Sequence, residues 1–248
     1  MNGSGWTCAV GLVFGPLACS GSSPVVPVVP PEVASQKVTF ETVQDLGGFT
    51  LQSSAHDERV TTGGKVLRES AVSLKWKDRD HWEYESLTDG RPTTHWLVNE
   101  GSAWESLSGG LLTLKGDPEP LRAQLGLAWD PWEDVVALTG GRIQYGAGVP
   151  ETVDGRAAVR HDVSLAPAAT VVAHRSFGPA MEPVALSGTV WIDSETAVRL
   201  LADVTVQSAT PGDASRSRTF NVKLAVTGLG QDPGVAVPPA ASPLPGAP

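Results

Sequence analysis

The sequence predicts a mainly β protein of the α+β class, in which an antiparallel sheet is interrupted by two short helices. Three patterns support this prediction. From Val66 to Leu107, apolar and polar residues alternate in short runs separated by turn residues, which is the two-residue period of strands. Residues 117–139 instead show helix-start residues followed by apolar steps of three and four. From Ile143 onward the two-residue period returns.

The composition is that of an acidic globular protein. The chain has 248 residues, of which 41% are hydrophobic and 18% are charged, enough for one sizeable domain or two small ones. The net charge is −9 and the pI is about 5.0, and the Lys and Arg residues form no cluster. We therefore expect no nucleic-acid partner, because such binding needs a basic surface.

The segment before the first clear strand is ambiguous. Within residues 36–46, three-residue apolar steps favour a short helix, whereas the Val, Thr and Phe content favours a strand. Gly47-Gly48 ends this segment. Alternation from Phe49 to Ala55 then predicts a strand, and Gly63-Gly64 marks the turn into the next one.

Four of the eight tryptophans lie between Val66 and Leu107. Polar turns, among them Asp89-Gly90, divide this stretch into the strands of a meander. An apolar sheet face must be buried against a second layer, a partner or a ligand. The phase of the alternation places six large residues on one face, where we expect them to line one apolar cavity: Leu74, Trp76, Trp82, Tyr84, Trp96 and Trp104.

Two helices follow the meander. Asp117-Pro118 is a cap followed by a proline at the first helical position, and residues 121–128 form one apolar stripe. Asp130 repeats the cap signal, with Glu133 placed to complete a capping box, and Gly140-Gly141 ends the second helix. We interpret these acidic residues as helix caps rather than catalytic carboxylates.

The rest of the chain returns to strands. We expect an irregular loop over residues 166–183 and a disordered tail from residue 229 to 248, because its Pro, Ala and Gly cannot bury a core. The folded domain is thus predicted to span residues 36–228. Its later strands are expected at Ala157–Leu165, Thr189–Ile192, Val198–Val206 and Phe220–Val226.

The amino terminus resembles a secretory signal peptide. Trp6–Ala18 is apolar but too short to span a membrane, so residues 1–18 are predicted to be a signal peptide. Leu17-Ala18-Cys19-Ser20 resembles the bacterial lipoprotein signal, in which the cysteine is acylated. An ordinary cleaved signal, or a buried strand with an inert cysteine, would be the alternatives. Residues 19–35 would then be the lipidated Cys19 and a Pro-rich tether.

Two local motifs resemble a known superfamily. They are Val153-Asp-Gly-Arg156 within residues 151–160 and Gly188-Thr-Val-Trp-Ile-Asp193 within residues 187–196. Over roughly residues 36–228 the body resembles the outer-membrane lipoprotein carrier (LolA/LolB-like) superfamily, including its mycobacterial lipid-binding lipoprotein relatives. This resemblance implies a strongly curved, half-open antiparallel β-barrel whose concave face is covered by the two short helices. It also implies an apolar cavity for acyl chains between the sheet and those helices.

No motif indicates catalysis. The sequence lacks a nucleophile elbow, a zinc-protease motif, a phosphate-binding loop and a dinucleotide fingerprint, so we expect neither an enzyme nor a cofactor. The five histidines show no ligand spacing, and we expect no metal site. His95 is expected in solvent and His161 in the core. A cation site at Asp78–His81 is an alternative, but a hairpin turn explains those residues.

Two classes of function remain. In the first, the chain is a monomeric lipoprotein in the cell envelope, anchored through Cys19 on the outer membrane and facing the periplasm, which binds lipid or acylated protein without chemistry. In the second, exposed tryptophans bind polysaccharide or make the chain an interaction scaffold. The direction of the rings separates these, because inward rings around an apolar void favour lipid and an exposed row favours sugar. Aromatic packing in a plain core remains a third interpretation.

Overall fold

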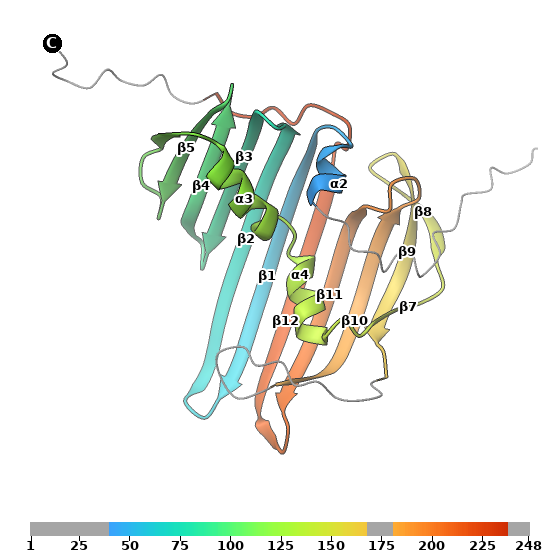
Figure 1. Cartoon of the computed structure of the whole chain (residues 1–248). Coiled ribbons are helices and arrows are strands. Elements are labelled where there is room, and N and C mark those ends of the chain that lie inside the picture. Colours follow the sequence, from blue (N-terminus) through green and yellow to red (C-terminus); the bar gives the residue numbers. More distant parts are fainter. Residues whose placement is uncertain (1–39, 168–180, 238–248) are drawn as a thin grey trace, which may run out of the picture.

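The computed structural model describes residues 40–167 and 181–237. These residues form one twelve-stranded antiparallel sheet that does not close, with short helices lying across one of its faces (Figure 1). The predicted fold class, a curved half-open antiparallel barrel with two short helices, is confirmed. The helices are α2 (Phe40–Gln44), α3 (Glu119–Ala128) and α4 (Trp132–Thr139).

The strands form two meanders that meet at the centre of the sheet. The order is β6-β5-β4-β3-β2-β1-β12-β11-β10-β9-β7, and β8 pairs with β9 off this path. The first and last strands therefore pair with each other, and α3 and α4 carry the chain from one edge to the other. The first meander comprises β1 (Phe49–Thr61), β2 (Gly64–Asp78), β3 (His81–Thr88), β4 (Arg91–Asn99), β5 (Ser102–Leu107) and β6 (Thr113–Gly116). The second comprises β7 (Ile143–Tyr145), β8 (Val149–Val153), β9 (Arg156–Leu165), β10 (Glu182–Asp193), β11 (Arg199–Thr210) and β12 (Asp213–Thr227).

Tight turns set the strand register, as the Asp-Gly signal predicted. Asp89 and Gly90 have φ of 51° and 72°, so both central residues of the turn lie in the left-handed region. This is the geometry of a type I′ hairpin turn, which matches the twist of the strands that it joins. Glu100-Gly101 and Asp154-Gly155 also have positive φ at both positions.

The sheet has two unlike faces. One row of register partners runs across β1, β2, β3 and β4 on one face. It consists of Leu51, Leu74, Tyr84 and Trp96, which are all at most 7% exposed. We call their side the helix-covered face, because α3 and α4 lie over it (Figure 1). The intervening residues make up the open face. Burying one face of an open sheet under helices is the expected solution for a sheet with this alternation.

The two sequence motifs that resemble the carrier superfamily lie against each other. Arg156 Nε donates a hydrogen bond of 2.6 Å to Asp193 Oδ2, and Trp191 Nε1 donates one of 2.6 Å to Glu151 Oε2. Asp193 also accepts hydrogen bonds from the backbone and hydroxyl of Thr196, which closes the turn after β10. Burial alone would raise the pKa of Asp193, but these bonds lower it.

The ambiguous segment before β1 is helical at Phe40–Gln44. Within residues 229–237, which the sequence assigns to a disordered tail, Leu229, Gly230 and Asp232 contact the rest of the fold. Leu229 is 8% exposed, Gly230 N–H donates to the Gly48 carbonyl at 2.7 Å, and Asp232 pairs with Lys77 at 2.8 Å. These contacts satisfy backbone groups that composition alone would leave to solvent.

Several expectations fall outside the described residues. They are the signal peptide, Cys19, the Pro-rich tether, most of the loop over residues 166–183, and residues 238–248. Within the described ranges, none of the helices has the length and apolar character needed to cross a membrane.

Candidate functional site

Five of the six predicted cavity residues lie together on the helix-covered face. Leu74, Trp76, Trp82 and Tyr84 come from β2 and β3, and Trp96 comes from β4. Trp76 pairs directly with Trp82, and the Tyr84 and Trp96 rings stack with centroids 4.8 Å apart. These side chains are between 0% and 7% exposed. The alternation in the sequence therefore predicted their common face.

Trp104 does not belong to this group. The two-residue turn after β4 places Trp104 opposite Leu97, while Trp96 lies opposite Glu105. Paired residues share a face, so Trp104 points to the open face and is only half-buried. A shift of one residue in register moves every side chain to the other face. The prediction that all six residues share one face is wrong at this position.

The helices bury the aromatic face tightly. Leu121 and Leu125 of α3, Trp132 and Val135 of α4, and Trp129 between the helices are all at most 7% exposed. At the strand ends, the Phe40 ring of α2 lies 5.0 Å from the Trp76 ring and 5.6 Å from the Trp129 ring, measured between centroids. The helical stripe that the sequence predicted is the surface that meets the sheet.

The rings point inward, toward the helices, and a small hollow lies elsewhere in the same layer. A hollow between the sheet and the helices, bordered by Leu51, Trp129 and Asp130, has a volume of about 10 Å³. That is about what a single water molecule needs, whereas ligand pockets typically measure about 300–1,000 Å³. Side chains fill the rest of this layer, and we call this packed arrangement the closed state.

Two indole groups in this layer are left without partners. Trp76 and Trp82 are 1% and 0% exposed, and neither Nε1 atom has a hydrogen-bond partner among the described residues. By contrast, Trp96 Nε1 donates to Glu105 Oε1 at 3.1 Å. A buried donor without an acceptor costs roughly 1–3 kcal/mol. Two such donors, on paired residues, are polar groups inside an otherwise apolar layer.

A buried ion pair holds α4 to the sheet. Asp130 Oδ1 accepts the Trp132 N–H at the start of α4 at 2.9 Å, although Pro131 rather than Asp130 is the N-cap residue. Asp130 Oδ2 lies 3.3 Å from Arg199 Nη2 on β11. Both side chains are at most 6% exposed, and the Arg199 guanidinium lies 4.8 Å above the Trp132 ring. Burial raises the pKa of Asp130, and Arg199 opposes that shift. The sequence did not indicate the ion pair, because 69 positions separate its members.

A charged cluster marks the far end of the helix-covered face. Arg218 and Arg59 both donate to the Asp57 carboxylate, at 2.7 Å for the closest contact of each. Burial would raise the pKa of Asp57, but hydrogen bonds from Arg218 and Arg59 lower it. Asp134 of α4 lies near this cluster, and burial raises its pKa. The apolar layer is thus bounded by charge on this side.

Two histidine expectations have different outcomes. His161 is 0% exposed and its Nδ1 lies 3.0 Å from the Gly146 carbonyl oxygen, as expected for a core histidine. His95 was expected in solvent. It lies on the face opposite Trp96, as predicted, but it is half-buried and its Nε2 is 3.1 Å from Glu83 Oε1. Asp78–His81 forms the predicted hairpin turn, with Asp78 paired to His81 across it.

Comparison with known proteins gives only remote matches. The sequence matches no protein-family model and no curated protein. Among solved structures, a DUF1329 family protein from Desulfovibrio piger aligns at 14% identity over 83% of this chain and 92% of that one, with a TM-score of 0.27. A structure described as an outer membrane lipoprotein-sorting protein domain from Vibrio parahaemolyticus aligns at 10% identity over 77% and 92%, with a TM-score of 0.23.

A LolA superfamily protein from Nitrosomonas europaea is a further match, at 6% identity over 76% of this chain and 94% of that one, with a TM-score of 0.20. The superfamily that the two sequence motifs resemble is therefore present among the structural matches. TM-scores this low do not align two structures closely. The fold is accordingly defined by the strand pairing of this chain.

Proposed function

We propose that this chain is a lipoprotein of the cell envelope that binds an acyl chain of a lipid or acylated protein between the sheet and helices α3 and α4. It does so without chemistry. Binding requires α3 and α4 to move away from the aromatic face, because in the closed state its side chains are at most 7% exposed. Each methylene moved from water into such a layer contributes about 0.8 kcal/mol, so a long chain can offset the cost of opening.

The observation that carries this proposal is the pair of unpartnered indole N–H groups of Trp76 and Trp82. In a plain core such donors remain unsatisfied at a cost, and polar side chains there usually find a partner. An ester or carboxyl oxygen at the head of an acyl chain would accept a hydrogen bond from either indole. The surrounding Leu74, Tyr84 and Trp96 would then contact the first methylenes.

The sugar-binding alternative has less support. Within residues 40–167 and 181–237, every tryptophan is buried or half-buried, so these ranges hold no flat exposed row of rings. Trp104 and Trp191 are the half-buried ones, and Trp191 is already tied to Glu151 at 2.6 Å. Stacking on a sugar needs a free ring face, which favours lipid over polysaccharide as the ligand class.

The test measures the binding of a fluorescent fatty acid to the protein that lacks residues 1–19. Organic extracts of the same protein are analysed by mass spectrometry. We expect saturable binding, weakened in Trp96→Leu on the helix-covered face and unchanged in the matched variant Trp104→Leu on the open face. Trp76→Phe keeps a ring but removes one N–H, and should weaken binding with little loss of stability. If the wild type binds no probe and the extracts contain no lipid, the layer is a plain core.

The anchor is a separate part of the proposal. Cys19 follows a signal-like stretch, and two or more acyl chains on it would hold the protein stably on a membrane. Cys19→Ser should move the protein from the detergent phase to the soluble envelope fraction. If Cys19→Ser stays in the detergent phase, something other than this cysteine holds the protein there.

A further inference from the structure

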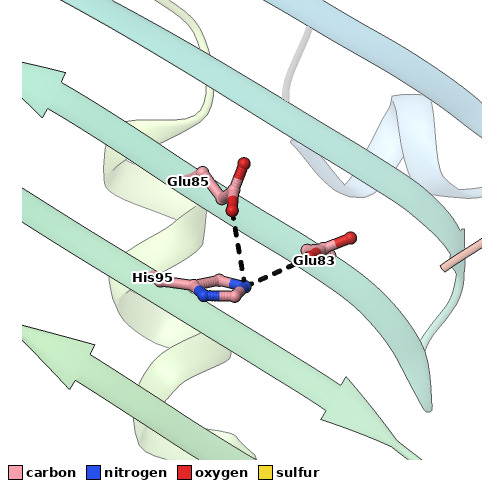
Figure 2. A group of neighbouring side chains, drawn as sticks. All are labelled: Glu83, Glu85 and His95. Carbon is pink, nitrogen blue, oxygen red and sulfur yellow. Dashed lines mark hydrogen bonds and ion pairs between the residues drawn. The ribbon is translucent and has the colours of Figure 1, made fainter. Parts of the chain in front are cut away.

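Two carboxylates and an imidazole converge on the open face, on the side of the sheet away from α3 and α4. Glu83 and Glu85 are alternate residues of β3, and His95 of β4 is the register partner of Glu85. Figure 2 shows both carboxylates directed toward the His95 ring. His95 Nε2 lies 3.1 Å from Glu83 Oε1 and 3.8 Å from Glu85 Oε1. One ligand atom from each residue lies within 4.8 Å of the other two.

These spacings approach those of a metal coordination shell. Zn²⁺ binds carboxylate oxygen and imidazole nitrogen at about 2.0–2.2 Å, so neighbouring ligands in a tetrahedral site lie roughly 3.3 Å apart. The separations of His95 Nε2 from the two carboxylates, 3.1 and 3.8 Å, lie close to that spacing. Rigid paired strands hold the three residues in place, which is the kind of support that a metal site requires.

The surroundings prepare Glu83 for this role. Its side chain is only 10% exposed, and Lys75 Nζ lies 3.2 Å from Oε2, which leaves Oε1 directed at His95. A metal ion at this point would take the place of the hydrogen bond between His95 and Glu83. The Lys75 cation would weaken the binding of a cation, but it leaves the three ligand atoms free to converge.

Space for a fourth ligand adjoins the cluster. A hollow of about 250 Å³ on this face is lined by Glu85 and His95 together with Leu87, Pro92, Ser106 and Gly110. Zinc sites with three protein ligands keep an open position for water or another small ligand. The hollow gives such a ligand a place to enter.

We infer that Glu83, Glu85 and His95 form a three-ligand site for a divalent transition-metal ion, Zn²⁺ in particular, open to the adjoining hollow. The alternative is a purely structural ion-pair network of Lys75, Glu83 and His95. The two differ in what Lys75 does. In a metal site its charge opposes the ion, whereas in a structural network it only stabilises the strands.

The experiment is calorimetric titration of the full chain in detergent, freed of metal with a chelator, with Zn²⁺. We expect one ion per chain, proton release that makes the binding heat depend on the buffer, and a Tm that rises with Zn²⁺ concentration. Glu85→Gln and His95→Gln should each weaken binding on the order of tenfold or more. His81→Gln, at the start of β3 beside the hairpin turn from β2, is the matched control and should bind as the wild type does.

Lys75→Met separates the two interpretations. It should tighten Zn²⁺ binding because it removes a like charge, even where it lowers the Tm of the metal-free protein. Co²⁺ gives a second measurement, since its visible absorption bands should change between the wild type and His95→Gln. Lack of Zn²⁺ binding by the folded wild type would overturn the inference. Equal binding by the wild type, Glu85→Gln and His95→Gln would place the ion elsewhere and overturn it too.

Discussion

The ion pair between Asp130 and Arg199 allows a sharp test of how the helices are held on the sheet. Asp130→Ala removes the acceptor for the Trp132 N–H, which costs about 1 kcal/mol as a lost helix cap. It also leaves Arg199, 6% exposed, as a buried cation without its carboxylate. Breaking one partner of a buried pair costs about 3–5 kcal/mol, so we expect a total loss of about 4–6 kcal/mol. For a domain of this size, that is a fall in Tm of roughly 10–20 °C.

The matched control is Asp117→Ala at the start of α3. Asp117 accepts the Glu119 N–H at 3.0 Å in the same way, but this bond is exposed and has no buried cation beside it. That substitution should cost about 1 kcal/mol. The assay is urea unfolding followed by circular dichroism, with the slope of the transition compared among variants, because a changed slope would mean a changed unfolded or native state.

The double variant Asp130→Ala/Arg199→Met completes the design. It removes both charges, and apolar replacement of a buried pair is often close to neutral, so the double variant should be more stable than Asp130→Ala alone. Arg199 also lies over the Trp132 ring, a contact that methionine partly retains. The reasoning is refuted if Asp130→Ala costs no more than Asp117→Ala, or if the two substitutions in the pair are simply additive.

Two further predictions concern the later strands. Gly188→Ala should prevent stable folding, because the φ of Gly188 is 137° and an added Cβ would lie 2.1 Å from the Asp203 carbonyl oxygen. The measurement is a large loss of soluble protein or a large fall in Tm. A Tm close to that of the wild type would show that β10 and β11 can separate at this point. Asp193→Asn should be less stable than the wild type at neutral pH, since Arg156 donates to a carboxylate whose pKa is lowered below its ordinary value of 3.8. A lowered folded-state pKa gives stability that is present above the unfolded value and lost as pH falls through the folded one. The difference in unfolding free energy between the wild type and Asp193→Asn should therefore shrink as pH falls below about 4, and a difference that stays constant down to low pH would contradict the assignment.

The aromatic strands show how far the sequence could predict the candidate site. Alternation within β2, β3 and β4 correctly grouped Trp76, Trp82 and Trp96, because side chains two residues apart always share a face of a strand. The prediction for Trp104 failed because the face on which Trp104 lies depends on the length of the turn before β5. A turn one residue longer or shorter moves the side chain to the opposite face. The error is therefore one of register between strands rather than of strand identity.

The predictions of a disordered tail from residue 229 and of a solvent-exposed His95 failed for a related reason. Composition predicted disorder from residue 229, yet Asp232 finds Lys77 at the end of β2. Spacing along the chain could not bring His95 together with Glu83, since the two meet only when β3 and β4 pair. In both cases the partner lies on another strand, where a pattern read along one segment carries no information about it.

The sequence by itself determined the properties that arise within a few residues: strand and helix periods, the Asp89-Gly90 hairpin, and the helix starts near Asp117 and Asp130, whose carboxylates accept the first N–H groups of α3 and α4. These follow from backbone sterics and local hydrogen bonds, which do not depend on the rest of the chain. Only the tertiary structure decided that β12 returns to pair with β1. It also decided that Arg199 meets Asp130 beneath α4. Such contacts depend on the order of strands in the sheet, which the whole chain determines by burying one apolar face under its helices.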